Sequence, residues 1–471
     1  MNIALLLALL AVLVFGVTAG VPTARATTFE IFPSNADASC NEELEVRANA
    51  LQPGDVLILH GGIYTQTCRR AITANGTPAN PVTIRAADGE TPIVTRPVPA
   101  NFRYDQNNVE IVNSSYLVIK GLRFKGGDGG VSFIGRHNIT FEDNEVYETG
   151  NNAIRMNSGN TDSFAIRRNH IHHTGLLASA AGTTEGEGLY VGCNNAACVA
   201  SNHLIEGNYI HHTRATSDGG NDGIEIKVGS YSNVVRNNVI HDTTDGRQYP
   251  CIFVYGGGPG PNVVEGNAMW NCGEAIQVVS DAVVRNNLVL NSMTGITAAP
   301  HAQVAQLRNV TIVNNTIYGH STCVFVRWSG ASNMILANNA LYCPGGAAVN
   351  GSGLTGSGLT ISSNYFEGTL SGTAADGAHF VGGGTAAAAF AGPAQLDFWP
   401  PAGSILIGKA EPKLAPAVDF NERPRVSPFD VGAYETDGLA ANPGWIVGPG
   451  FKQGGSGSSN RPAAPTNLKL E

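Results

Sequence analysis

The sequence predicts an all-β fold, a solenoid in which each coil of chain rests on the coil before it. A short phrase, apolar-x-x-Asn-x-apolar, recurs about every 20 to 40 residues between 141 and 366, as FEDNEV, IRRNHI, IEGNYI, VRNNVI, VEGNAM, VRNNLV, IVNNTI, LANNAL and ISSNYF. Apolar residues alternate around it with a period of two, and no helical period is present. These observations predict a single-stranded parallel β-helix, right-handed because crossovers between parallel strands are right-handed.

The recurring Asn is expected where the chain turns between strands. Asparagine tolerates left-handed backbone angles, and its amide can bond the equivalent Asn one coil away. Such a ladder supports the turns and carries no chemistry.

A second strand is expected in each coil, and its apolar residues also alternate. One set should stack inside the tube, while the residues between them face solvent. The inward set is Ile154, Leu189, Ile224, Ile252, Ile276, Ile296 and Val324.

The ends of the chain differ from the repeat. Residues 3–17 are apolar and precede a small-x-small pattern at 24–26, which predicts a signal peptide over 1–26, with an uncleaved anchor as the alternative. We therefore expect a secreted protein, extracellular or periplasmic, with no membrane span after cleavage. Residues 27–435 should form the β-helix domain, with a helical N-terminal cap at 40–51 and a C-terminal cap, and 436–471 a flexible tail with a Gly/Ser linker.

The chain has 8 cysteines, all after the apolar segment, which suits an oxidising compartment. Cys251 with Cys272, and Cys323 with Cys343, are separated by about one coil, so they are expected to form disulfides. Cys193 with Cys198 would close a local loop, which leaves Cys40 with Cys68.

The formal net charge is -9, and 14% of residues are charged. No basic surface is available for nucleic acid, and an anionic partner would need a local cation. A monomer is expected.

Long loops interrupt the repeat at 175–186, 193–201 and 214–221, and loops on a rigid scaffold usually carry function. The outward residues of the second strand lie beside them. Polar groups flanked by aromatic rings are typical of a sugar groove, with an ordinary solvated face as the alternative. The candidate residues are Arg155, Tyr190, Phe253, Tyr255, Gln277 and Arg327.

Acidic residues gather at the turn entering this strand. Glu187 and Asp222 are one coil apart, so their carboxylates would repel unless a cation or shared proton is present. Calcium is the natural candidate, with Glu187, Asp222 and Glu225 as ligands. Structural turn-capping by the same acids is the alternative.

Histidines form a third cluster, in IHHT at 171–174, IHHT at 210–213 and IHDT at 240–243. One predicted file holds Tyr147, His172, His211, His241 and Trp270, and the next holds His173, His212 and Asp242. The repetition favours a structural ladder of stacked rings over a zinc site.

The signal peptide, the helical plug, the Asn-punctuated coils and DVGAYE at 430–435 together resemble secreted bacterial β-helix proteins of the pectate lyase-like superfamily. DGIEIKVGSYSNVVRNN at 222–238 is similar to a region of polysaccharide lyase family six, and a related phrase occurs in family nine pectate lyases. The resemblance implies that Asp222 and Glu225 bind calcium and that Lys227 is the catalytic base.

The sequence thus favours a lyase that cleaves an anionic, uronic-acid-containing polysaccharide by calcium-assisted β-elimination. Lys227 would take the C5 proton, Tyr190 or Tyr255 would protonate the leaving oxygen, and Arg155 would hold a neighbouring uronate. Phe253, Gln277 and Arg327 would bind substrate. C5 epimerisation, glycoside hydrolysis by two of the carboxylates, and a non-catalytic carbohydrate-binding or surface protein remain the alternatives.

Overall fold

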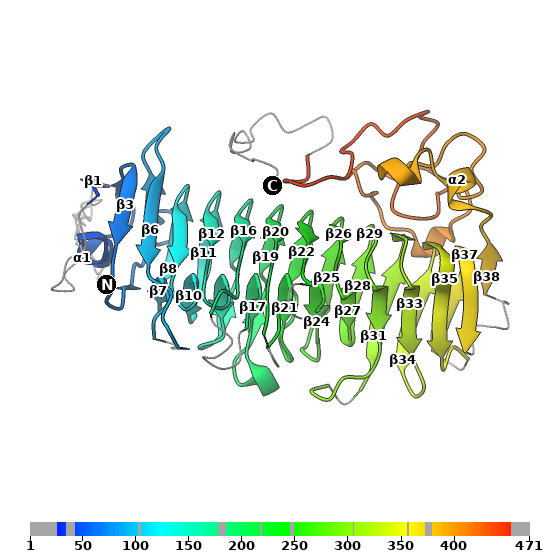
Figure 1. Cartoon of the computed structure of the whole chain (residues 1–471), viewed down its shortest axis with the longest axis horizontal. Helices are drawn as coiled ribbons and strands as arrows, with labels where there is room; N and C mark the ends of the chain where they lie inside the picture. The colour runs from blue at the N-terminus through cyan, green and yellow to red at the C-terminus, as the bar shows by residue number, and fades with distance from the viewer. Residues whose placement is uncertain are drawn as a thin grey trace, which may run out of the picture.

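The computed structural model describes residues 26–33, 43–101, 105–177, 185–216, 219–244, 249–304, 306–355, 358–372 and 379–453. Over these ranges the chain winds into a right-handed β-solenoid, as predicted, with its coils stacked side by side along the long axis (Figure 1). The described strands line three faces, which we call sheets A, B and C, and B and C together make up one 23-stranded sheet.

Sheet A is the 15-stranded sheet of the described residues. Its strands are β1 (Thr28–Ile31), β2 (Val56–Leu59), β5 (Val82–Ala86), β8 (Ser115–Lys120), β11 (Arg136–Glu142), β14 (Thr161–Asp162), β15 (Ala165–Arg167), β18 (Ala200–Ser201), β19 (Leu204–Glu206), β22 (Val234–Arg236), β25 (Asn262–Glu265), β28 (Ser280–Arg285), β31 (Arg308–Val313), β34 (Ser332–Ala337) and β36 (Leu359–Ser362).

Sheet B follows sheet A in each coil. Its strands are β3 (Gly62–Thr65), β6 (Pro92–Arg96), β9 (Arg123–Gly126), β12 (Glu145–Tyr147), β16 (His170–His172), β20 (Tyr209–His211), β23 (Val239–His241), β26 (Ala268–Trp270), β29 (Leu288–Leu290), β32 (Thr316–Tyr318), β35 (Ala340–Ser352), β37 (Asn364–Gly372) and β38 (Phe380–Gly382).

Sheet C closes the coil. Its strands are β4 (Ala71–Ile72), β7 (Val109–Val112), β10 (Val131–Ile134), β13 (Ile154–Met156), β17 (Leu189–Val191), β21 (Ile224–Ile226), β24 (Ile252–Val254), β27 (Glu274–Val278), β30 (Thr294–Ala298) and β33 (Thr322–Arg327). The long strands β35 and β37 run through both B and C at the last coils.

The inward residues stack as the alternation predicts. Parallel pairing places Ile154 beside Leu189, Leu189 beside Ile224, and Ile224 beside Ile252. All four are fully buried in one continuous apolar core. Because the register is one residue to one residue, each outward side chain also has a neighbour directly above and below it.

The Asn ladder is present and buried. Asn208 Nδ2 donates to Asn238 Oδ1 at 2.9 Å, and Asn238 Nδ2 donates to Asn267 Oδ1 at 3.0 Å. The expected left-handed backbone belongs to the preceding residue instead, as in Asn237 (φ 56°) and Asp143 (φ 57°). None of the described ladder Asn residues has a positive φ.

The N-terminal end is closed by helix α1 (Glu43–Ala50), within the segment where a plug was predicted. Leu44 and Ala48 are buried and belong to the solenoid core. The helix therefore covers apolar side chains that the first coil would otherwise leave open.

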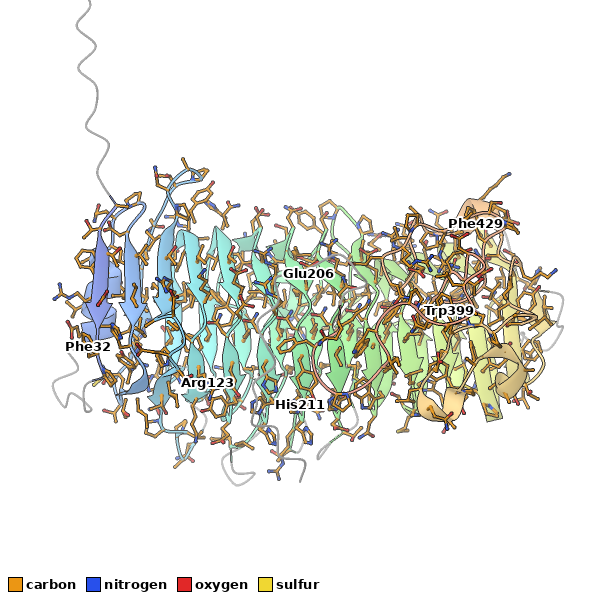
Figure 2. All side chains as sticks on the ribbon, turned by 90° about the horizontal axis from the view of Figure 1, so that it is seen from above. Phe32, Arg123, Glu206, His211, Trp399 and Phe429 are labelled. Carbon is orange, nitrogen blue, oxygen red and sulfur yellow. A yellow bond between two sulfur atoms is a disulfide. The ribbon has the colours of Figure 1, made fainter. Side chains whose placement is uncertain are left out.

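The C-terminal segment, residues 383–453, lies along the outer face of sheet B. It holds α2 (Ala386–Ala389) and the short 3₁₀ turns η4 (Pro393–Gln395) and η5 (Pro412–Leu414). Phe398, Trp399 and Phe420 form a second apolar core with Leu288 and Tyr342 of sheet B. Figure 1 shows the segment running back over the middle coils, and Figure 2 places Trp399 and Phe429 above the later strands. Packing continues to Lys452, beyond the predicted domain end at 435.

Three predicted disulfides are confirmed: Cys193–Cys198, Cys251–Cys272 and Cys323–Cys343, with Cα separations of 4.9, 5.7 and 5.9 Å. The last two join successive coils. Cys68 is also disulfide-bonded, but its expected partner Cys40 lies outside the described residues.

None of the helices in the described ranges has the length and apolar character needed to cross a bilayer. The predicted signal peptide, apart from Ala26, and residues 454–471 of the tail also lie outside those ranges.

Candidate active site

A groove opens on the outer face of sheet C, beside strands β17, β21, β24 and β27. Parallel register places Tyr190 next to Glu225, Glu225 next to Phe253, and Phe253 next to Gln277. The predicted outward column is therefore real. The cavity holds about 390 Å³ and is lined by Glu185, Glu187, Tyr190, Asn194, Gly219, Gly220, Asp222, Glu225, Lys227, Tyr249, Pro250, Phe253, Tyr255, Glu274, Gln277, His301 and Gln303.

The prediction that this column faces open solvent is wrong. Lys227 and Tyr255 are each 4% exposed. Glu185, Asn194 and Gly220, one from each of the three long loops, contribute to the groove lining. A Cβ on Gly220 would lie 2.6 Å from Glu187 Oε1, so only glycine lets this loop come so close to the acids.

Three carboxylates meet at the floor of the groove. Glu187, Asp222 and Glu225 are all buried, and one oxygen from each lies within 4.8 Å of the others. Asn152 donates a hydrogen bond to Glu187 Oε2. Asp222 Oδ1 is buried and accepts no hydrogen bond from the described residues.

This acidic cluster is electrostatically unfavourable when fully ionised. Burial raises the pKa of Glu187 and of Asp222 well above their usual ranges, and the neighbouring Glu225 raises both further. Burial also raises the pKa of Glu225, and Lys227 opposes that rise. The cluster must therefore hold protons or a cation.

Lys227 lies against the acids. Its Nζ donates to Glu225 Oε1 at 2.6 Å and lies 4.8 Å and 4.7 Å from the ring centroids of Tyr190 and Tyr255. The Tyr255 hydroxyl donates to the same Glu225 oxygen at 3.2 Å. Burial and then Glu225 raise the pKa of Tyr255, so this phenol stays protonated.

Aromatic rings form one wall. The Phe253 and Tyr255 rings are stacked, with centroids 4.0 Å apart. His301 stands edge-on to both, at 5.5 Å from Phe253 and 4.9 Å from Tyr255. Burial and then Lys227 lower the pKa of His301, so its imidazole is neutral at physiological pH.

The comparisons with known proteins agree with this architecture. The model of the right-handed beta helix region matches residues 107–293 and 197–341. The chain is a right-handed β-helix protein. No curated protein matches it in sequence.

Several solved structures resemble this β-helix protein. Pectate lyase Pel9A aligns with a TM-score of 0.53 and 14% identity, over 88% of this chain and 97% of that one. An alginate lyase from Paenibacillus sp. str. FPU-7 aligns with a TM-score of 0.44 and 19% identity, over 74% of this chain and 99% of that one. The mannuronan C-5 epimerase AlgE4 A-module of Azotobacter vinelandii aligns with a TM-score of 0.42 and 14% identity, over 68% of this chain and 87% of that one. At these identities the likeness concerns the fold.

Two predicted site residues of the β-helix protein are not in the groove lining. Arg155 is buried, pairs with Asp128 Oδ2 at 3.0 Å, and donates from Nε to Asn152 Oδ1 at 2.5 Å. It thus positions Asn152, which in turn binds Glu187. Arg327 lies further along sheet C, where its guanidinium stacks 3.8 Å from the Phe325 ring centroid and donates to the Asn350 side chain.

Other groove residues were not found from the sequence. His301 and Gln303 follow strand β30, in a loop that the repeat does not describe. By contrast, the sequence does place Glu274 at the position equivalent to Glu187 and Asp222, and it lines the groove at the start of β27, where burial raises its pKa as well.

The predicted histidine file is confirmed on the outer face of sheet B. The rings of His172 and His211 are stacked at 5.2 Å, those of His211 and His241 at 5.2 Å, and those of His241 and Trp270 at 4.5 Å. These residues lie on a different sheet from the groove.

Proposed function

We propose that this β-helix protein is a polysaccharide lyase that cleaves a uronic-acid-containing polysaccharide by calcium-assisted β-elimination in the sheet C groove. The observation that carries the proposal is the buried cluster of Glu187, Asp222 and Glu225 in direct contact with Lys227. A base beside an anionic pocket in an aromatic groove fits an acidic sugar held by a bridging cation. Pel9A shares the fold, but the proposal depends on the groove itself.

The residues present fit a calcium ion. Calcium prefers carboxylate oxygens, and the three acids supply them from two adjacent coils. Three carboxylates and one ammonium leave two negative charges, which one divalent cation balances. Asp222 Oδ1, without a hydrogen bond from the described residues, is the natural ligand atom. When bound, calcium would hold the substrate carboxylate and stabilise the charge that develops beside it.

The chain's own groups would carry out the proton transfers. Lys227 Nζ, having first released a proton to solvent, would take the C5 proton as a neutral amine, the C5 electron pair would form the C4–C5 double bond, and the C4–O4 bond to the leaving group would break. Tyr255 would donate its hydroxyl proton to the departing oxygen, with Tyr190 as the alternative donor. Both rings already enclose Lys227 Nζ.

The groove walls would bind the sugar. Phe253 offers an apolar ring face, and Gln277 and His301 offer polar groups nearby. Arg155 is engaged with Asp128 and is better suited to positioning the acid cluster than to holding a neighbouring uronate. Arg327 would reach only a sugar several coils from Lys227.

A panel of polymers tests the proposal. Purified protein would be incubated with pectate, alginate, glucuronan and glycosaminoglycans, with calcium or with a chelator. The ultraviolet absorbance of a C4–C5 unsaturated product is expected for at least one polymer, and it should disappear with chelator. New reducing ends without that absorbance would instead indicate hydrolysis, and altered C5 configuration without cleavage would indicate epimerisation. No change in any polymer would favour a binding protein.

We also propose that the protein is exported. The three disulfides of the described residues support an oxidising compartment, and the expected substrates are extracellular. Fractionation of the source cells would locate the protein.

A further inference from the structure

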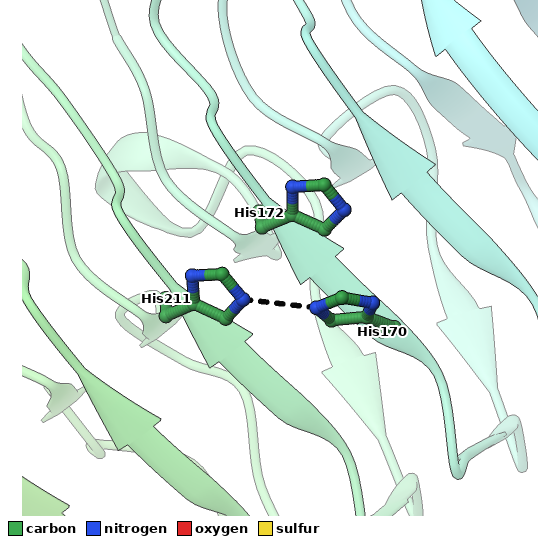
Figure 3. A group of neighbouring side chains, drawn as sticks. All are labelled: His170, His172 and His211. Atoms are coloured by element: carbon green, nitrogen blue, oxygen red, sulfur yellow. Dashed lines mark hydrogen bonds between the residues drawn. The ribbon is translucent and has the colours of Figure 1, made fainter. Parts of the chain in front are cut away.

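A histidine cluster on sheet B has features that a stacked ladder does not require. His170 and His172 both point outward from β16, because they are two residues apart, and His211 stands beside His172 on β20. Figure 3 shows the three rings facing one another across two neighbouring coils. His170 was not singled out from the sequence, although the period of two from His172 places it on the same face.

The ring nitrogens converge. One nitrogen from each of His170, His172 and His211 lies within 4.8 Å of the others. His170 Nε2 and His211 Nε2 are only 2.9 Å apart. The His172 and His211 rings stack face to face as in a ladder, but His170 also directs its Nε2 at His211 Nε2, which stacking does not require. Three imidazoles are a common protein donor set for zinc.

The adjacent histidines, His173 and His212, contact the Nδ1 atoms of His172 and His211. His172 Nδ1 lies 2.7 Å from His173 Nδ1, and His211 Nδ1 lies 2.6 Å from His212 Nδ1. In each pair Nδ1 of the first histidine contacts its neighbour, and its Nε2 faces the centre, where it contacts Glu145 Oε1 in His172 and His170 Nε2 in His211. Metal-binding histidines usually have their second nitrogen fixed in this way.

A carboxylate completes the surroundings. Glu145 Oε1 lies 3.1 Å from His172 Nε2 and 3.6 Å from His170 Nδ1, while Arg123 Nε holds Glu145 Oε2 at 2.8 Å. By contrast, His241 directs Nδ1 to Asp242 and Nε2 to the Tyr209 hydroxyl, and its nitrogens do not belong to the converging group.

The cluster is sheltered but reachable. The side chains of His170 and His172 are 13% and 14% exposed. The Phe451 ring of the C-terminal segment lies 6.4 Å from the His170 ring and 5.9 Å from that of Tyr209. The His170 and His172 side chains therefore keep some surface exposed to solvent.

We propose that His170, His172 and His211 bind one zinc ion, with the fourth position directed toward Glu145. The ion would join strands β16 and β20 and so fasten two coils together, which makes the site structural. It lies on a different sheet from the groove and does not depend on the proposed lyase activity.

Metal titration of the full-length protein tests this proposal. Protein stripped with chelator would be titrated with Zn²⁺ by calorimetry and with Co²⁺ by visible absorption. We expect one ion per chain, tetrahedral Co²⁺ bands, a higher Tm with Zn²⁺, and no displacement by excess Ca²⁺. Failure to saturate at one ion per chain would overturn the proposal.

Variants identify the ligands. H211F keeps a flat ring in the stack but removes both nitrogens, and should weaken Zn²⁺ binding roughly 100-fold or more and abolish the Tm increase. H172F provides a second test if H211F does not fold. Each variant counts as folded if its Tm in chelator equals that of the wild type. H137F, on sheet A, and E187Q, in the groove, should bind Zn²⁺ normally. Unchanged binding in H211F and H172F, or loss in E187Q, would contradict the assignment.

Discussion

Lys227 Nζ lies 2.6 Å from Glu225 Oε1, and both side chains are almost completely buried. The proposed base therefore rests on one of the proposed calcium ligands. A cation on Glu225 would compete with the Lys227 ammonium for the same oxygen. Metal binding and base function are then coupled through a single carboxylate.

Replacing Lys227 with arginine separates its two roles. K227R keeps a cation beside Glu225, so folding should be preserved, whereas K227A would leave a buried carboxylate without its partner. Arginine does not give up its proton at neutral pH, so kcat should fall roughly 100- to 10,000-fold. Product absorbance and thermal melting measure the two effects. Lys125, an exposed lysine, provides the control K125R, and near-normal turnover in K227R would remove Lys227 as the base.

Asp222→Asn should change the response to calcium. Calcium at 100 times its Kd would stabilise the wild type by about 2.7 kcal/mol, because it binds only the folded acids. D222N removes a ligand and a buried charge, so it should melt higher than wild type in chelator and gain little from calcium. Thermal melts over a calcium series measure this. D88N, at an exposed acid, should behave as wild type, and an equal calcium gain in D222N would argue against this ligand.

The raised pKa of Glu187 predicts the direction in which the stability of the folded protein changes with pH. Above the unfolded pKa of 4.5 the unfolded chain loses its proton while the folded one retains it, so stability falls as pH rises from about 4.5 toward the raised folded pKa. In chelator, E187Q should remove this loss, so its advantage in Tm over wild type should grow with pH above 4.5. Calcium should shrink the difference. A constant difference from pH 4 to 8 would mean that Glu187 is not strained by its neighbours.

Arg155 is expected to matter for folding more than for chemistry. Its pair with Asp128 is buried on both sides, so R155M should cost about 3–5 kcal/mol in the free energy of unfolding. R236M, at the more exposed Arg236–Glu206 pair, should cost below about 1 kcal/mol. Denaturant unfolding measures both. If R155M instead unfolds like wild type but loses turnover as K227R does, Arg155 has the catalytic role first expected of it.

The sequence predicted those parts of the site that follow from stacking. Glu187 and Asp222 had to meet because equivalent positions of adjacent coils lie about 4.8 Å apart, and the same rule aligned His172 with His211. Burial of the groove was missed because it depends on how the long loops fold, and periodicity does not encode loop conformation.

The sequence pattern also did not predict contacts between side chains at non-equivalent positions of neighbouring coils. His301 contacts Tyr255 from an irregular loop. Arg155, in β13, pairs with Asp128, which lies in the turn between β9 and β10 of the preceding coil. The C-terminal segment packs on sheet B through Trp399 and Phe420, although no repeat links them to the solenoid. The left-handed backbone lies one residue before the ladder Asn, because asparagine can serve either the turn or the ladder and the repeated phrase does not say which.

The fate of the C5 hydrogen tests the central claim most directly. A uronan deuterated at C5 and cleaved by the calcium-loaded protein would be analysed by mass spectrometry of the products. Abstraction by Lys227 predicts that every newly formed non-reducing end has lost its deuterium and carries the C4–C5 double bond. Saturated new ends that keep the deuterium would contradict β-elimination in this groove.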